Sequence, residues 1–241
     1  MSAIEPESSS TQLAAGTAGY HRANFAMFIA GFSCFVMLYA TQPILPLLAS
    51  VFGISPAAVS LSVSAGTFAL ALTLVPASWL SDRIGRQALM RWSLLAAAVF
   101  ALLAALAQDF HQHLLLRALL GFSLAGVPAA ALAYLGEEIA PAAQGRAIGL
   151  YIAGNALGGM SGRYLTALLT DWFDWQTALT TIGVLGIIAA ISFWRMLPEA
   201  RNFVPRFVPL RALHRDIGFL LREPGLPQLF LVALLMMGAF V

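Results

Sequence analysis

The sequence contains no lysine, a single cysteine and few charged side chains of either sign. All 13 basic residues are arginine, and charged residues make up only 10% of the 241 positions. The arginines are scattered among apolar blocks without forming a basic face, which argues against a nucleic-acid partner. Because Cys34 stands alone within an apolar block, the sequence has neither a disulfide framework nor a cysteine-based metal cluster.

Long apolar blocks take up most of the chain. Hydrophobic residues account for 60% of the sequence, above the roughly 45–50% that is usual in soluble domains. The blocks have about the twenty residues that a helix needs to cross a bilayer. They are continuously apolar, which excludes the alternating pattern of a membrane β-barrel. The sequence therefore predicts an all-α, multi-pass membrane protein. We place spanning helices at 24–46, 57–80, 88–107, 114–136, 146–169 and 176–197, with the start of a seventh at 226–241.

The placement of arginine predicts the orientation in the membrane. Eleven of the 13 arginines fall in the tail, in the second and fourth connections, or in and beside the segment after the sixth helix. The opposite connections, around 47–56, 108–113 and 170–175, contain no arginine or lysine. Since cytoplasmic loops carry an excess of basic residues, we expect the N-terminus to lie in the cytoplasm.

The regions outside the six helices are predicted to be a tail and a linker. Residues 1–23 are small, polar and slightly acidic and lack the basic start of a signal peptide, so we interpret them as a disordered cytoplasmic tail. The 198–225 segment is predicted to be a basic cytoplasmic linker, in which 210–222 has the spacing of an amphipathic surface helix. These regions flank a six-helix transmembrane domain at 24–197 and precede a truncated seventh helix at 226–241.

One stretch, SWLSDRIGRQALM at 78–90, concentrates the scarce charge. Asp82 and Arg86 are four residues apart and can pair if the turn is helical, and Gly85 permits a tight turn between two helices. The stretch resembles the motif G-x-L-(A/S)-D-R-x-G-R-(K/R)-x-x-L of the major facilitator superfamily, in the loop that joins helices two and three. It departs from that motif at Ser78, Gln87 and Met90.

The resemblance implies that Asp82, Arg83, Gly85 and Arg86 form a cytoplasmic latch between the two halves of a transporter, holding its outward-facing state. The alternative is a solvated turn that only obeys the topology rule. Glu137, at the cytoplasmic edge of the fourth helix, is placed to pair with Arg86 across this face.

Three further stretches are similar to the same family. RALLG at 117–121 matches the helix-four pattern R-x-x-x-G. GNALGG at 154–159 resembles the helix-five motif G-P-x-x-G-G of the antiporter branch, with Asn155 in place of proline, so we expect this helix to stay unbroken. LPEAR at 197–201 resembles the end of helix six. The family has two six-helix halves, each an inverted pair of three-helix repeats, with the substrate between the halves. The chain is expected to be one such half plus part of a seventh helix, a truncated transporter.

Two arginines fall inside predicted helices, where an unpaired charge is costly. Arg117 and Arg163 lie in helices four and five, and no acidic residue lies deep in any of the six helices to match them. We hypothesise that Arg117 lines the cavity and attracts an anionic group, or holds a central polar network as the family's helix-four arginine does. Arg163 is a second cavity candidate. The alternative for Arg117 is snorkelling to the outer surface.

Helix one ends in YATQPILP, whose prolines free backbone groups for hydrogen bonding. Because helix one lines the cavity in this family, Tyr39 and Gln42 are candidate substrate contacts, and Asn155 of helix five is another. The alternative for Tyr39 is a place in the aromatic belt at the membrane interface.

Gly154, Gly158 and Gly162 repeat every fourth residue on one face of helix five. Small residues in this spacing predict the close approach of a neighbouring helix. Such a face also suits sliding against the other half.

The leading functional hypothesis is a secondary active transporter that moves a small organic solute outward by alternating access, linked to protons. Because this half has no buried carboxylate, we expect the missing C-terminal half to carry the proton site, unless coupling runs through edge acids such as Glu137. The alternative is a truncated, non-transporting membrane subunit or remnant. No nucleophile with a base, metal cluster or phosphate loop appears, so neither enzymatic activity nor a metal or cofactor is expected. The resemblance implies a bacterial inner-membrane protein whose partners are its small-molecule substrate, the proton, the bilayer and the missing half.

Overall fold

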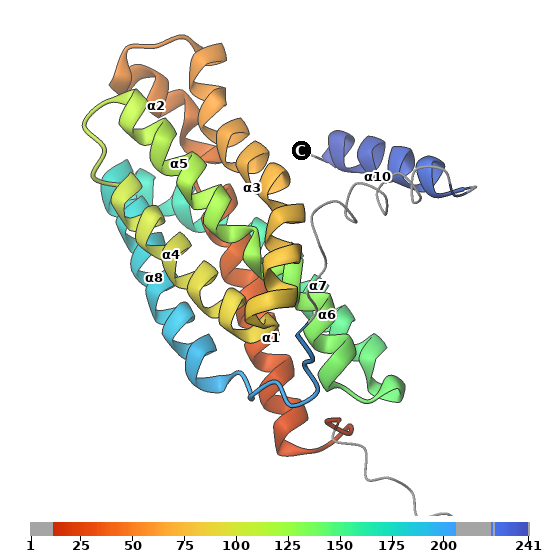
Figure 1. Ribbon diagram of the computed structural model, residues 1–241. Helices are drawn as coiled ribbons and strands as arrows, with labels where there is room; N and C mark the ends of the chain where they lie inside the picture. The colour runs from red at the N-terminus through yellow and green to blue at the C-terminus, as the bar shows by residue number, and fades with distance from the viewer. Residues whose placement is uncertain (1–11, 206–222, 224, 241) are drawn as a thin grey trace, which may run out of the picture. The chain divides into compact units, whose positions relative to one another are not determined.

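The computed structural model describes residues 12–205, 223 and 225–240. Within these residues the regular structure is helical (Figure 1), apart from one isolated β-bridge between Leu13 and Ile139. The chain divides into two units at residue 205, and each unit is described by itself. The second unit contains helix α10 (Leu226–Phe240), at the position predicted for the start of a seventh helix.

The first unit is a bundle in which every predicted span has a helical counterpart. The six spans correspond to α1 (Ala18–Tyr39), α3 (Pro56–Ile84), α4 (Arg86–Ala104), α5 (Phe110–Leu124) continued by α6 (Gly126–Glu138), α7 (Pro141–Trp172) and α8 (Trp175–Met196). The short helices η1 (Gln42–Ile44) and α2 (Leu45–Phe52) follow α1.

Five helical segments of the described residues are long and apolar enough to cross a membrane. They are Ala18–Phe52, Pro56–Ile84, Arg86–Ala104, Phe110–Glu138 and Trp175–Met196. Helix α7 has 32 residues, ample length for a span, but its glycines and polar side chains, among them Asn155 and Arg163, lower its hydropathy. It remains one unbroken helix through Asn155, as the absence of proline predicted.

Polar caps explain where several helices begin. Asp109 accepts a hydrogen bond from Gln112 N at 2.9 Å at the start of α5, and Asp174 accepts one from Thr177 N at 2.6 Å at the start of α8. Ser55 caps α3 in the same way. These side chains satisfy backbone N–H groups that have no partner within the first helical turn. Asp109 and Asp174, two acidic residues of the arginine-free connections, therefore have a structural use.

Residues 12–23 do not form the disordered segment that the composition predicted. Helix α1 begins at Ala18 and is capped by Thr17, which accepts a hydrogen bond from Tyr20 N at 3.2 Å. Leu13 N donates to Glu138 O at 2.7 Å, and Leu13 O accepts from Ala140 N at 3.1 Å. The sequence pattern missed this contact because it pairs backbone groups, which every residue carries. Residues 1–11 lie outside the described residues, as does the predicted surface helix at 210–222.

The order of helix packing follows the inverted repeat. Helix α1 packs most extensively against α7, and α3 against α5, while α4 packs against α8. In the inverted repeat, α1 corresponds to α5 with α6, α3 corresponds to α7, and α4 corresponds to α8. Under this correspondence the contact of α1 with α7 is equivalent to the contact of α3 with α5. The contact of α4 with α8 is equivalent to itself. The two three-helix repeats are therefore interlocked, each placing its first helix against the second helix of the other.

Glycines allow these contacts to be close. Gly154, Gly158 and Gly162 of α7 lie against the backbone of α1 at Phe28, Phe32 and Val36 respectively, and a Cβ on any of them would collide with a carbonyl oxygen. Gly121 of α5 makes the equivalent contact with Gly66 of α3. The glycine face of α7 is covered by α1, so the suggestion that it slides against another half is wrong.

Replacing Gly158 with alanine is expected to destabilise the bundle by about 1–3 kcal/mol, because the new methyl group collides with the Phe32 carbonyl oxygen. Thermal unfolding of the purified protein in detergent measures the effect. Gly149→Ala on the same helix is the matched control, since a Cβ there meets nothing within 4 Å. Equal melting temperatures for the two variants would contradict the close contact.

Candidate functional site

The charged hairpin between α3 and α4 turns at Gly85, which has φ of 100° and ψ of 143°. A positive φ of this kind is readily adopted only by glycine, so the residue permits two helices to meet with no intervening loop. Asp82 lies in the last turn of α3, and Arg86 is the first residue of α4. The turn brings these two side chains to the same point.

Arg86 is the centre of a network that joins three helices. Its Nη1 lies 2.5 Å from Asp82 Oδ1, and its Nη2 lies 3.1 Å from Glu137 Oε1 at the end of α6. The guanidinium also donates through Nε to the same Glu137 oxygen at 3.3 Å and through Nη1 to Ser81 Oγ at 3.1 Å. The whole residue is only 8% exposed. Because the cation bonds two carboxylates and is largely shielded from water, these contacts are stronger than those of a surface ion pair.

Arg83 takes a different position on the same turn. Its guanidinium lies over the ring of Trp79, 3.7 Å from the ring centroid. A cation over an indole face is stabilised by the ring quadrupole. The hairpin therefore holds one arginine by carboxylates and another by an aromatic ring.

Glu138, which the sequence interpretation left without a role, fixes the segment that follows α8. Its carboxylate accepts hydrogen bonds from the Asn202 backbone N at 2.8 Å and from Asn202 Nδ2 at 3.1 Å. Gln87 Nε2 donates to the carbonyl oxygens of Leu197 and Pro198, at 3.1 and 2.9 Å. The consecutive Glu137 and Glu138 thus hold the hairpin and the following segment side by side. The sequence feature that could have pointed to Glu138 is the pair of adjacent acidic residues, Glu137 and Glu138, in a chain with few acidic residues.

Three of the predicted cavity residues meet at the end of α1. Arg163 of α7 donates through Nε to Gln42 Oε1 at 2.5 Å, and its guanidinium lies 4.2 Å from the centroid of the Tyr39 ring. Helix α1 ends at Tyr39, and the turn into η1 places Gln42 beside it. Arg163 and Gln42 are partly exposed, whereas Tyr39 is 8% exposed. The cluster presents a cation, an amide and an aromatic ring together.

Arg117 is buried among backbone carbonyls. It is 3% exposed and donates to Met37 O at 3.0 Å, Leu38 O at 2.5 Å and Ser62 O at 3.3 Å. Met37 and Leu38 belong to the last turn of α1, whose carbonyls have no helical partners and carry partial negative charge. This arrangement compensates the charge without a carboxylate, and the alternative of snorkelling to the outer surface is wrong.

Asn155 does not join the Tyr39, Gln42 and Arg163 cluster. It faces Gly31 of α1, where a Cβ on the glycine would collide with Asn155 Oδ1. Arg163 follows eight residues later in the same helix, about 12 Å along its axis. The Oδ1 atom is buried and has no hydrogen-bond partner among the described residues.

The family model of the Major Facilitator Superfamily matches residues 27–241, nearly the whole chain. The chain belongs to this superfamily. The membership agrees with the interlocked repeats and with the hairpin network, which lies where the family's motif predicted charged residues.

Two relatives illustrate the likeness. The chain is 43% identical over 226 residues to the inner membrane transport protein YnfM of Escherichia coli (strain K12), covering 94% of this chain and 54% of that protein. It is 41% identical over 231 residues to the uncharacterized MFS-type transporter YybF of Bacillus subtilis (strain 168), covering 96% of this chain and 57% of that protein. The chain therefore spans about half the length of these curated relatives.

The fold also matches solved members of the superfamily. A crystal structure of the peptide transporter POT in complex with sulfate superposes with a TM-score of 0.68 at 15% identity, covering 91% of this chain and 47% of that one. At this identity the likeness concerns the fold alone. The six-helix unit of the present chain is thus one half of a Major Facilitator Superfamily bundle.

Proposed function

We propose that the chain is the N-terminal half of a secondary active transporter that exports a small organic solute by alternating access, driven by protons. The observation that carries this proposal is the network of Asp82, Arg86 and Glu137. This network places three charged side chains at the hairpin, although α3 and α4 could pack against each other without any charged residue there. A network of hydrogen-bonded charges at one end of the bundle can be either intact or broken. Alternating access requires two such discrete states.

The Tyr39, Gln42 and Arg163 cluster is proposed to contact the solute. A guanidinium and an amide recognise a carboxylate or another oxygen-rich group, and the Tyr39 ring adds an aromatic face. Asn155, with its unpartnered Oδ1, is proposed as a second polar contact further along α7. Arg117 is proposed to hold the central polar network by fixing the end of α1, which carries Tyr39.

Proton coupling is proposed to use an acid of the second half. The described acidic residues of this chain lie near helix ends, and Glu137 is already paired with Arg86. Protonation of Asp82 or Glu137 would weaken the network, so these edge acids offer the alternative route.

We further propose a bacterial inner-membrane location with the N-terminus in the cytoplasm, in keeping with the positive-inside rule and with the Escherichia coli relative, which is named an inner membrane transport protein. The proposed division is a tail, the six-helix domain, a basic linker at 198–225 and a seventh helix that opens the second half. A non-transporting subunit or remnant is the other candidate.

Proteoliposomes test both candidates. The full-length transporter and the 241-residue chain are reconstituted separately, and radiolabelled organic acids, amino acids and cationic drugs are screened with and without a proton gradient. The proposal expects gradient-dependent movement of at least one solute by the full-length transporter. Absence of movement under every gradient, with correctly folded protein, favours the non-transporting candidate.

Arg163→Gln is expected to raise the KM for the transported solute about tenfold or more, because a charge-assisted contact is lost, while the melting temperature changes little. Arg163 is partly exposed, so its removal leaves no buried charge uncompensated. Transport kinetics in proteoliposomes provide the measurement. Arg146→Gln on the same helix is the control, and an unchanged KM in Arg163→Gln would remove this residue from the solute site.

A further inference from the structure

A groove runs between α4 and α8 on the surface of the bundle, near its arginine-rich end. Leu95, Ala190, Ile191, Trp194 and Arg195 line it, and its volume is about 110 Å³. Its walls are apolar except at Arg195, which lies at the end of α8. None of these residues takes part in the hairpin network or in the Tyr39 cluster. In a membrane protein, an apolar surface groove of this kind is open to lipid.

Two tryptophans mark the depth of the groove in the membrane. Trp92 of α4 is 62% exposed, and its ring meets that of Trp194 edge to face with centroids 4.9 Å apart. Tryptophan is enriched at the boundary between headgroups and hydrocarbon, because its ring is apolar and its N–H seeks a polar partner. The arginine end of the groove is therefore at headgroup level, with the apolar walls directed toward the hydrocarbon.

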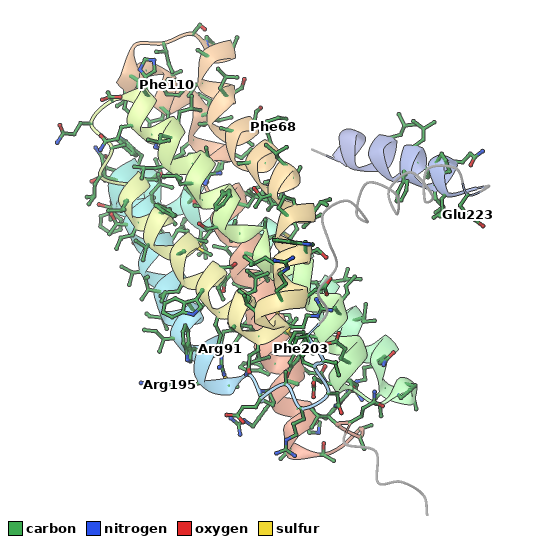
Figure 2. The ribbon with its side chains drawn as sticks, viewed as in Figure 1. Phe68, Arg91, Phe110, Arg195, Phe203 and Glu223 are labelled. Carbon is green, nitrogen blue, oxygen red and sulfur yellow. The ribbon has the colours of Figure 1, made fainter. Side chains whose placement is uncertain are left out.

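Three arginines from three helices lie at the end of α8. Arg22 of α1 donates through Nη2 to Arg195 O at 3.2 Å, which brings its guanidinium to the end of α8. Arg91 of α4 donates to Trp194 O at 3.0 Å, and its guanidinium lies 5.5 Å from the centroid of the Trp194 ring. Arg22 and Arg195 are exposed, and Figure 2 shows Arg91 and Arg195 at the same end of the bundle.

The charge of this cluster is positive. Glu138 and Glu199 line a pocket together with Arg22 and Arg201, and the charge of Glu199 also acts on Arg91. The guanidinium groups of Arg22, Arg91, Arg195 and Arg201 outnumber these two carboxylates and leave a net positive site beside an apolar groove. Basic pockets between membrane helices are suited to anionic lipid headgroups.

We propose that this groove binds an anionic phospholipid. The phosphodiester accepts hydrogen bonds from Arg22 and Arg195, the glycerol region lies against Trp92 and Trp194, and one acyl chain follows Leu95, Ala190 and Ile191. This lipid ties α1, α4 and α8 together at the end of the bundle that carries the hairpin network. Its role is separate from solute recognition.

Lipid binding to the purified protein tests the proposal. The protein in detergent is titrated with phosphatidylglycerol, and bound lipid is counted by native mass spectrometry. The double variant Arg22→Gln/Arg195→Gln is expected to weaken binding of the tightest lipid roughly thirtyfold, since each lost charge contact contributes about fivefold. Arg22→Lys/Arg195→Lys keeps both charges and is expected to retain most of the binding.

Arg146→Gln is the matched control, because Arg146 is an exposed arginine of α7 outside the cluster. It is expected to bind phosphatidylglycerol as the unaltered protein does. Three results would each overturn the proposal: equal affinity for phosphatidylcholine, displacement of the lipid by inorganic phosphate, or unchanged affinity in a folded double glutamine variant. Transport measurements are not needed for any of these outcomes.

Discussion

Arg86→Gln is expected to reduce transport by more than tenfold and to lower the melting temperature of the bundle. The substitution leaves Asp82 and Glu137 facing one another without the cation that bonds both. Removing one partner of a buried charge network costs about 3–5 kcal/mol, and the cost is smaller here because the side chains of Asp82 and Glu137 are 27% and 31% exposed. Initial transport rates in proteoliposomes and unfolding in detergent measure the two effects.

The double variant Arg86→Gln/Glu137→Gln separates charge balance from simple loss of contacts. Removing both charges leaves Asp82 as the one acid of the network, so stability is expected to recover relative to Arg86→Gln, whereas transport is expected to stay low. Arg146→Gln serves as the control for loss of an arginine elsewhere. If Arg86→Gln transports at the normal rate when it is folded, the hairpin network has no part in the transport cycle.

Arg117→Met is expected to destabilise the bundle by about 3 kcal/mol or more. The methionine matches much of the arginine's length but leaves the carbonyls of Met37 and Leu38, at the end of α1, without their donors, while the Ser62 carbonyl keeps its place in the interior of α3. Each orphaned buried polar group costs about 1–3 kcal/mol, offset in part because no charge has to be buried. Thermal unfolding in detergent gives the measurement.

Arg163→Met is the comparison for this prediction, since Arg163 is partly exposed and lies on a different helix, α7. Its melting temperature is expected to fall much less. A charge-retaining Arg117→Lys variant has fewer donors in a different geometry and is expected to lie between the two. Equal stability of Arg117→Met and the unaltered protein would show that the carbonyls of α1 do not depend on this residue.

Features governed by local spacing could be predicted from the sequence. Each of the six predicted blocks corresponds to helical structure, and five of the resulting segments are long and apolar enough to cross a membrane, because a helix must bury or immerse its apolar surface over a fixed length. Asp82 and Arg86 pair, but not through the helical spacing that was the condition for this prediction: Gly85 between them is non-helical, with φ of 100° and ψ of 143°, so the two residues belong to different helices and the turn itself brings them together. Glu137 was placed by topology alone, at the same end of the bundle as Arg86.

Features that depend on backbone atoms or on distant segments could not. Arg117 bonds to carbonyl oxygens, and every residue has one, so no sequence pattern points to the partners that compensate its charge. Glu138 and Asn202 are 64 residues apart, and neither has a pattern that points to the other. The glycines of α7 predicted a close neighbour, but only the packing identifies α1 as that neighbour.

The interlocked repeats bear on how the protein is made. During synthesis α1 leaves the ribosome first, while the glycine surface that receives Phe28, Phe32 and Val36 belongs to the fifth span. Until α7 has been synthesised and inserted, the surface of α1 that will contact α7 must therefore face lipid or an insertion factor. A ribosome stalled before residue 141 would leave a nascent chain whose first helix lacks its main partner, a ready substrate for membrane quality-control proteases.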